Sequence, residues 1–133
     1  MTGARVARLA RAGAVVGALA LGAHARAATA EDGQAVSDAC LAKAITTYDI
    51  VACQKATLAI VERELNTVYK QAVASLPDDQ LVAAERLWVS FRQIDCDVFY
   101  GEQTGTIASI QGGGCMIGHA RNRIADLKAI ITP

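Results

Sequence analysis

The run of residues 85–96 reads Glu-Arg-Leu-Trp-Val-Ser-Phe-Arg-Gln-Ile-Asp-Cys, and it contains the chain's one tryptophan and one of its two phenylalanines. Apolar side chains recur in and around this run with the 3.6-residue period of an α-helix. The spacing predicts a helix over about residues 79–100, placed at the centre of a small helical bundle. The expected buried face consists of Leu81, Ala84, Trp88, Phe91 and Val98, with Leu87 and Ile94 beside it.

Before this run, apolar residues step by three and four over residues 47–75 and predict another helix. Thr46 is the expected N-cap, and Asp49 three residues later completes a pattern close to a capping box. Pro77 cannot continue this helix, and Asp78 is a suitable cap for the next one. Such a short link makes the two helices antiparallel. The expected buried stripe of the earlier helix is Leu58, Val61, Leu65, Val68, Ala72 and Leu76.

After this run, residues 101–114 contain five glycines and several small polar residues, which predicts a long loop. A third helix is expected from about Cys115 onwards. Residues 31–45 predict an irregular or briefly helical lead-in. The predicted fold class is therefore all-α, a small antiparallel three-helix bundle. The apolar stripe of its third helix is Ile117, Ala120, Ile124, Leu127 and Ile131.

The beginning of the chain has the features of a secretory signal peptide. Three arginines precede an apolar segment, residues 12–23, which is too short to span a bilayer. Small residues then predict cleavage after Ala30, with Ala27 as the second choice. We therefore expect residues 1–30 to be removed and residues 31–133 to form an exported domain, periplasmic or secreted. An uncleaved membrane anchor is the alternative.

Removal of the signal peptide changes the charge of the chain. The complete chain has 13 basic and 13 acidic residues, and residues 1–30 hold four of the basic ones and no acidic one. The remaining domain therefore has nine basic and 13 acidic residues, a net charge of −4. A nucleic-acid partner is not expected because it requires a basic surface. A cationic protein partner suits this charge.

Four cysteines remain in the exported domain, and an even number in a short exported chain predicts two disulfides. No pair has C-x-x-C spacing, so we expect no metal site and no other cofactor. One pairing joins Cys40 to Cys53, which fastens the lead-in, and Cys96 to Cys115, which closes the glycine loop. The competing pairing joins Cys53 to Cys96 and Cys40 to Cys115.

Several short motifs follow one another along residues 40–130. They are Cys40-x-x-Lys43-Ala44, Cys53, Glu64-Leu65-Asn66-x-x-Tyr69-Lys70, Arg86-x-Trp88-x-x-x-Arg92-x-x-Asp95-Cys96, and Cys115 ahead of Arg121 and Leu127. In this combination the chain resembles the lysozyme inhibitor LprI-like family of exported bacterial domains. The resemblance implies a small helical, disulfide-bonded domain and inhibition of lysozyme. Membership of a broad family does not by itself fix one activity.

Most motif residues are expected to be structural. Trp88 is interpreted as a wedge in the core rather than as a binding anchor. Asn66 is expected to tie a helix to a loop, with ligand contact as the alternative. Arg92 and Asp95 lie one helical turn apart, and Glu64 is expected to reach them from the earlier helix, which would form a structural ion-pair network around Arg92. The complete structural set is Asn66, Tyr69, Trp88, Arg92, Asp95 and Arg121.

The sequence shows no catalytic constellation, and we predict that the protein is not an enzyme. A glycosidase would need two carboxyl groups across a sugar cleft, and Glu64 with Asp95 is the pair that would have to supply them. Nothing in the sequence indicates such a cleft. His119 is a lone histidine, and oxidised cysteines cannot act with it as nucleophiles.

The glycine loop is the candidate recognition element, because long loops on a rigid scaffold often carry function. We expect it to block the cleft of a lysozyme, with polar side chains bonding the two carboxyl groups that the enzyme uses. The alternatives are a plain connector and, for the whole protein, an envelope structural or interaction module without inhibitory activity. The candidate binding residues are Thr104, Thr106, Ser109 and Gln111.

Overall fold

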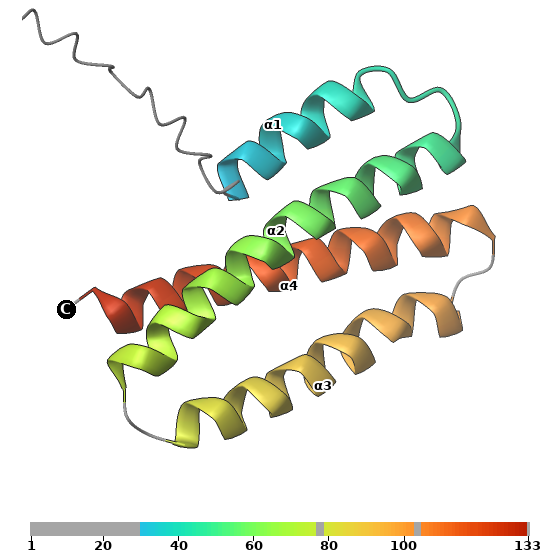
Figure 1. The fold of residues 1–133 in the computed structure, drawn as a ribbon. Helices are drawn as coiled ribbons and strands as arrows, with labels where there is room; N and C mark the ends of the chain where they lie inside the picture. Colours follow the sequence, from blue (N-terminus) through green and yellow to red (C-terminus); the bar gives the residue numbers. More distant parts are fainter. Residues whose placement is uncertain (1–29, 77–78, 103–104, 133) are drawn as a thin grey trace, which may run out of the picture.

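A computed structural model describes residues 30–76, 79–102 and 105–132, and these residues contain helices and no strand. Residues 1–29 of the predicted signal peptide lie outside the described part, as do Pro77 and Asp78. No described helix has the length and apolar character that crossing a membrane requires. The helices are α1 (Ala30–Leu41), α2 (Thr47–Ser75), α3 (Asp79–Glu102) and α4 (Thr106–Ile131) (Figure 1).

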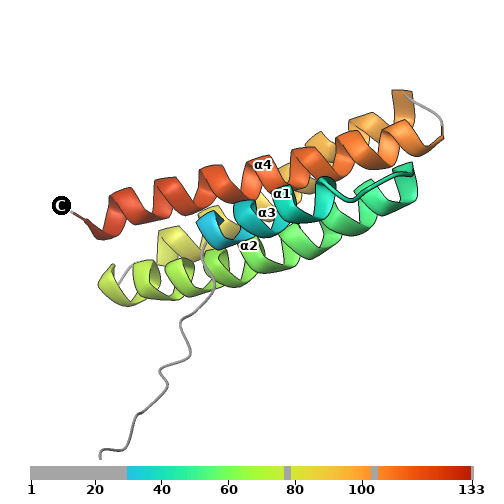
Figure 2. The same cartoon turned by 90° about the horizontal axis from the view of Figure 1, so that it is seen from above.

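The four helices are arranged around the interface between α2 and α4, which is the largest in the molecule. Helix α1 packs against α2, and α3 packs against α4 with little contact to α2. Figure 1 places α1 and α3 at opposite edges, and Figure 2 shows the same helices from above. The all-α prediction is confirmed, but the predicted number of three helices is wrong.

The additional helix is α1, which occupies most of the segment predicted as a lead-in. Helix α1 packs against α2. A Cβ atom at Gly33 would lie 3.3 Å from side-chain atoms of Ile60 and Val61, which shows how closely the two helices approach. The disulfide between Cys40 and Cys53 holds the other end of α1 against α2.

The capping box predicted at the start of α2 is present in the structure. The Thr46 hydroxyl accepts a hydrogen bond from the Asp49 N–H at 3.1 Å, and the Asp49 carboxylate accepts one from the Thr46 N–H at 2.9 Å. These two bonds satisfy N–H groups that have no partner within the helix. Helix α2 spans Thr47–Ser75, which matches the predicted range of residues 47–75.

The capping box gives the protein a pH-dependent element. Hydrogen bonds from the Thr46 backbone and hydroxyl, and from the Ile45 backbone, lower the pKa of Asp49 from its ordinary value of 3.8. The ionised carboxylate therefore contributes stability above its unfolded-state pKa, and this contribution is lost as the pH falls through the lowered folded-state pKa. We expect Asp49→Asn to lose stability at neutral pH and to show a smaller further loss in acid than the parent. Urea unfolding at several pH values measures this, and parallel pH profiles would contradict it.

The core lies between α2 and α4, and the predicted apolar stripes of both helices supply it. Trp88 of α3 packs against this core as a half-buried wedge, as predicted. The buried cluster consists of Val61, Leu65, Val68, Ala72, Leu81, Ala120, Ile124 and Leu127.

Helix α3 is an edge helix, so the prediction that it lies at the centre is wrong. Leu81 is buried, but Phe91 and Val98 of the predicted buried face are each 55% exposed. The reason is that α3 packs mainly on one neighbour, α4, and that contact covers a narrow stripe of its surface.

The predicted glycine loop over residues 101–114 is mostly helical. Helix α3 continues to Glu102 and α4 begins at Thr106, well before the predicted start near Cys115. A Cβ atom at Gly112 would lie 2.6 Å from the Tyr100 ring, and one at Gly113 would lie 2.7 Å from the Gln54 side-chain oxygen. Gly112 and Gly113 are therefore glycines because the side chains of Tyr100 in α3 and Gln54 in α2 pack directly against the α4 backbone. This packing offsets the roughly 0.5–1 kcal/mol by which each helical glycine is less favourable than alanine.

The glycines of α4 differ in how much space surrounds them, and this gives a stability test. A Cβ atom at Gly118 would have nothing within 4 Å. We therefore expect Gly118→Ala to raise the free energy of unfolding by about 0.5–1 kcal/mol through helix propensity. We expect Gly112→Ala to gain less or to destabilise, because the new methyl group displaces Tyr100. Urea unfolding of both variants measures the difference, and equal effects would contradict this account.

Candidate functional site

A disulfide fixes the end of the molecule where α3 turns into α4. Cys96 and Cys115 are bonded with a Cα–Cα distance of 5.6 Å, and Cys40 is bonded to Cys53 at the same Cα–Cα distance. The first predicted pairing is therefore confirmed and its competitor is excluded. The Cys96–Cys115 bridge joins two helices rather than closing a loop, so it holds α3 and the beginning of α4 in one orientation.

The beginning of α4 presents backbone donors to its surroundings. Its N-cap is Gly105, with a φ of 82°, and no side chain caps the helix there. The first turn contains no acidic residue. The N–H groups of a first helical turn have no partner within the helix, and they carry the positive end of the helix dipole. Thr106 in this turn is exposed, so the α4 start is suited to receive a carboxylate.

The four predicted binding residues do not form one loop. Thr104 lies outside the described residues, and Thr106 lies in the first turn of α4. Ser109 lines a cavity of about 310 Å³ shared with Gln54 of α2. Gln111 lines a different pocket of about 520 Å³ between α3 and α4. Ser109 and Gln111 therefore belong to different surfaces of the same helix.

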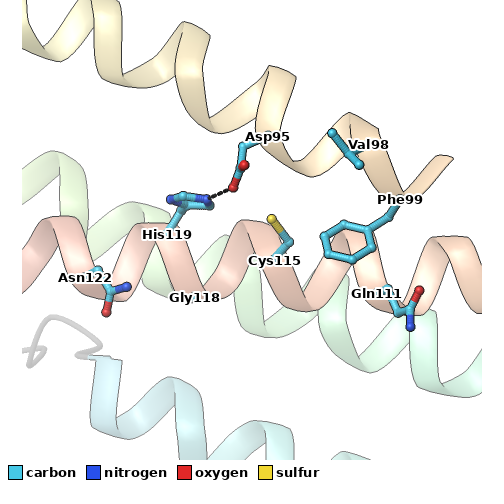
Figure 3. Close-up of a pocket in the computed structure, with 8 residues that line it drawn as sticks. All are labelled: Asp95, Val98, Phe99, Gln111, Cys115, Gly118, His119 and Asn122. Atoms are coloured by element: carbon cyan, nitrogen blue, oxygen red, sulfur yellow. Dashed lines mark hydrogen bonds and ion pairs between the residues drawn. The ribbon is translucent and has the colours of Figure 1, made fainter. Parts of the chain in front are cut away.

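The α3–α4 pocket is organised by a carboxylate–imidazole pair. His119 Nε2 lies 2.7 Å from a carboxylate oxygen of Asp95, as the dashed line in Figure 3 shows. The Phe91 ring packs edge-on against the His119 ring, with 5.4 Å between ring centroids. Asp95 is thus held by a histidine of α4 rather than by Arg92, the partner expected from their spacing.

The same region brings together four potential metal ligands, which are Asp95, Cys96, Cys115 and His119. One ligand atom from each lies within 4.8 Å of the others. Both sulfur atoms are used in the disulfide, however, and metal coordination by cysteine requires a thiolate. The remaining carboxylate and imidazole are fewer than the three or four protein ligands of a typical zinc site.

The described residues also argue against the glycosidase arrangement. Glu64 pairs with Lys128 at 2.7 Å, whereas Asp95 pairs with His119 at 2.7 Å. These two partners are nine residues apart on α4, which corresponds to about 13 Å along a helix. The two carboxyl groups are thus each held by a different basic side chain, at separate positions on α4.

Trp88 lies at the centre of a charged network that connects three helices. The Arg92 guanidinium lies 4.9 Å from the centroid of the Trp88 ring, and that of Arg123 lies 5.8 Å away. Arg92 pairs with Glu62 of α2 at 3.1 Å, and Arg123 pairs with Glu85 at 2.9 Å. An ion-pair network around Arg92 is therefore present. Its acidic partner is Glu62 rather than Glu64, because the side of α2 that carries Glu62 faces α3.

The other motif residues do not form one site. Asn66 is exposed and makes no side-chain hydrogen bond within the described part of the chain, so no tie to a loop is seen there. Tyr69 packs against the core and, with Asn66, lines a cavity of about 290 Å³ between α2 and α3. Arg121 is half-buried, and its Nη2 atom is buried without a hydrogen-bond partner among these residues. The sequence did not indicate Glu62, Glu85 or Arg123, since ordinary helical charges have no distinguishing local pattern.

One comparison with known proteins gives a match. A family model described as "Lysozyme inhibitor LprI" matches residues 37–127. No curated protein and no solved structure matches the chain. The matched residues include all four helices at least in part and both disulfides.

Proposed function

Because the chain belongs to the lysozyme inhibitor LprI family, we propose that it binds and inhibits a lysozyme or a related cell-wall lytic enzyme outside the cytoplasm. The family match over residues 37–127 is the observation that carries this proposal. Two disulfides support a location outside the cytoplasm, where such bonds persist. The signal peptide over residues 1–30 and the exported domain over residues 31–133 remain part of the proposal.

The α4 start is the proposed contact with the enzyme. Lysozymes cleave glycosidic bonds with a pair of carboxyl groups in a cleft. The uncapped first turn of α4 offers backbone N–H groups, the dipole's positive end and the Thr106 hydroxyl, all of which favour a carboxylate. Ser109 and Gln111 lie on different surfaces of α4, so only one of them would contact the rim of the cleft. The Cys96–Cys115 bridge keeps this end rigid and so limits the entropy lost on binding.

The charge of the domain supports the choice of partner. Residues 31–133 carry a net charge of −4, which attracts a cationic enzyme over long distances. This attraction raises the association rate more than the final affinity. Inhibition should therefore weaken with increasing salt mainly through slower association.

A charged substitution at the α4 start tests the contact without endangering the fold. Thr106→Glu places a carboxylate in the first turn, where it stabilises a helix. The same carboxylate would repel the enzyme's carboxyl groups, so we expect at least a tenfold higher concentration for half-inhibition, about 1.4 kcal/mol. Ala125→Glu is the control, because this exposed position lies far along the same helix and carries the same charge change. The measurement is the rate at which lysozyme clears a peptidoglycan suspension.

The outcomes separate the contact from the function. Equal inhibition by Thr106→Glu and the parent would show that the α4 start is not the contact. Failure of the parent to slow clearing at a large molar excess would remove lysozyme inhibition itself. Binding to lysozyme or to another exported protein without slower clearing would favour the alternative function, an envelope interaction module.

A further inference from the structure

Helix α3 exposes a row of large apolar side chains. Leu87 is 73% exposed, Phe91 55%, Ile94 69% and Val98 55%. The four positions are spaced by four, three and four residues, which is the a/d repeat of a coiled-coil seam. We call these four residues the α3 row. Single exposed apolar residues are ordinary, but a contiguous row on one helix marks an interaction surface.

The position of α3 explains why the row is open. Helix α3 packs on α4 through another side, where Trp88 contacts the core and Cys96 forms the bridge. Figure 1 shows α3 at the edge of the molecule, and it has little contact with α2. Among the described helices, α4 contacts the α3 row only at its margin, where the Phe91 ring meets the His119 ring and Val98 borders the α3–α4 pocket. Most of the apolar surface of the row stays exposed and is open to a partner.

We propose that the α3 row binds the α3 row of a second copy of this chain, with the two helices antiparallel. A two-fold axis between Phe91 and Ile94 sets the register. Phe91 then faces the second copy's Ile94, and Leu87 faces the second copy's Val98. Each contact occurs twice because the same patch is used on both subunits. Each of these side chains then inserts between residues of the facing helix, as in knobs-into-holes packing.

The charges beside the row support this orientation. Arg86, Ser90, Gln93 and Asp97 each precede a member of the row by one residue, so they follow one flank of it. Arg86 is exposed and has no ion pair within the described residues, and Asp97 is exposed and accepts a hydrogen bond from Gln93 at 2.8 Å. Antiparallel pairing brings Arg86 of one copy towards Asp97 of the other, twice in the dimer. Parallel pairing would place this flank of the two copies on opposite sides of the seam, so Arg86 and Asp97 would not meet.

The same flank argues against the other possible occupants. One exposed base and one exposed acid balance each other there, so the flank has no excess of negative charge to attract a cationic enzyme. It also lacks the cluster of basic residues that draws an amphipathic helix to anionic lipid. A helix with the same apolar spacing and the complementary charge order is the best fit, and α3 itself has both. This inference does not depend on lysozyme inhibition, and the proposed dimer leaves the α4 start outside the seam.

Sedimentation velocity of the exported, disulfide-bonded protein over about two decades of concentration tests the proposal. We expect the mass to change from that of one chain to that of two. We expect Ile94→Glu to weaken association at least 100-fold, because it buries two unpaired carboxylates in the seam. Gln93→Glu is the matched control, since it adds the same charge one residue away from the row. It should change association much less.

A charge exchange tests the orientation. We expect Arg86→Asp or Asp97→Arg alone to weaken the dimer several-fold, and the double variant to recover most of the loss, because only antiparallel pairing joins these two positions. Far-UV circular dichroism confirms that each variant is folded. A single-chain mass at every concentration would overturn the proposal, as would equal association of Ile94→Glu and Gln93→Glu. A monomer whose lysozyme binding is lost in Ile94→Glu would overturn it too and assign the row to the enzyme.

Discussion

Loss of the Cys96–Cys115 bridge is expected to lower the free energy of unfolding by about 3 kcal/mol. The bridge spans 19 residues, and closing a loop of that size restricts the unfolded chain by roughly this amount. For a domain of about 100 residues, such a loss corresponds to a melting temperature lower by roughly 12–24 °C. Urea and thermal unfolding of the Cys96→Ala/Cys115→Ala double variant measure both quantities.

The second bridge provides the control for this experiment. The Cys40–Cys53 bridge spans 13 residues, so its removal should cost a similar free energy of unfolding. It fastens α1, however, whereas Cys96–Cys115 orients the α4 start. We therefore expect inhibition of lysozyme to fall further in the Cys96→Ala/Cys115→Ala variant, at a temperature where both variants are folded. Equal inhibition by the two double variants would show that the Cys96–Cys115 bridge does not orient the surface that contacts the enzyme.

Trp88→Ala is expected to destabilise the protein by about 2–3 kcal/mol, below the roughly 3–5 kcal/mol of a fully buried tryptophan because Trp88 is half-buried. The ring packs on the core between α2 and α4 and lies under the guanidinium groups of Arg92 and Arg123. Its removal takes away both cation–π contacts and opens space beside Arg92, whose Nε atom is already buried without a hydrogen-bond partner among the described residues. Urea unfolding followed by far-UV circular dichroism gives the value.

Replacement of Trp88 by phenylalanine distinguishes the effect of lost packing volume from the effect of losing the aromatic ring. Trp88→Phe keeps an aromatic face for the two arginines but fills less space, so we expect it to cost about 1 kcal/mol. A loss below about 0.5 kcal/mol for Trp88→Ala would place the residue among ordinary surface positions and contradict its role as a wedge.

The sequence by itself determined the features that depend on neighbouring residues. The boundaries of α2 and its capping box follow from groups within a few residues of one another, and they were predicted correctly. The apolar stripes of α2 and α4 were also readable, because side chains three and four residues apart share one face of a helix. The family was recognisable because its motifs occur in order along the chain.

The tertiary structure decided which faces are covered and which charges meet. A glycine-rich run reads as a loop until it is known that Tyr100 and Gln54 pack against the α4 backbone at Gly112 and Gly113. The apolar residues of α3 read as core until it is known that one neighbour covers that helix. Likewise, Glu62 rather than Glu64 meets Arg92 because of the rotation of α2 towards α3. Local spacing specifies a helix and its two faces, but the position of a helix depends on surface buried against distant segments, which no short run of sequence contains.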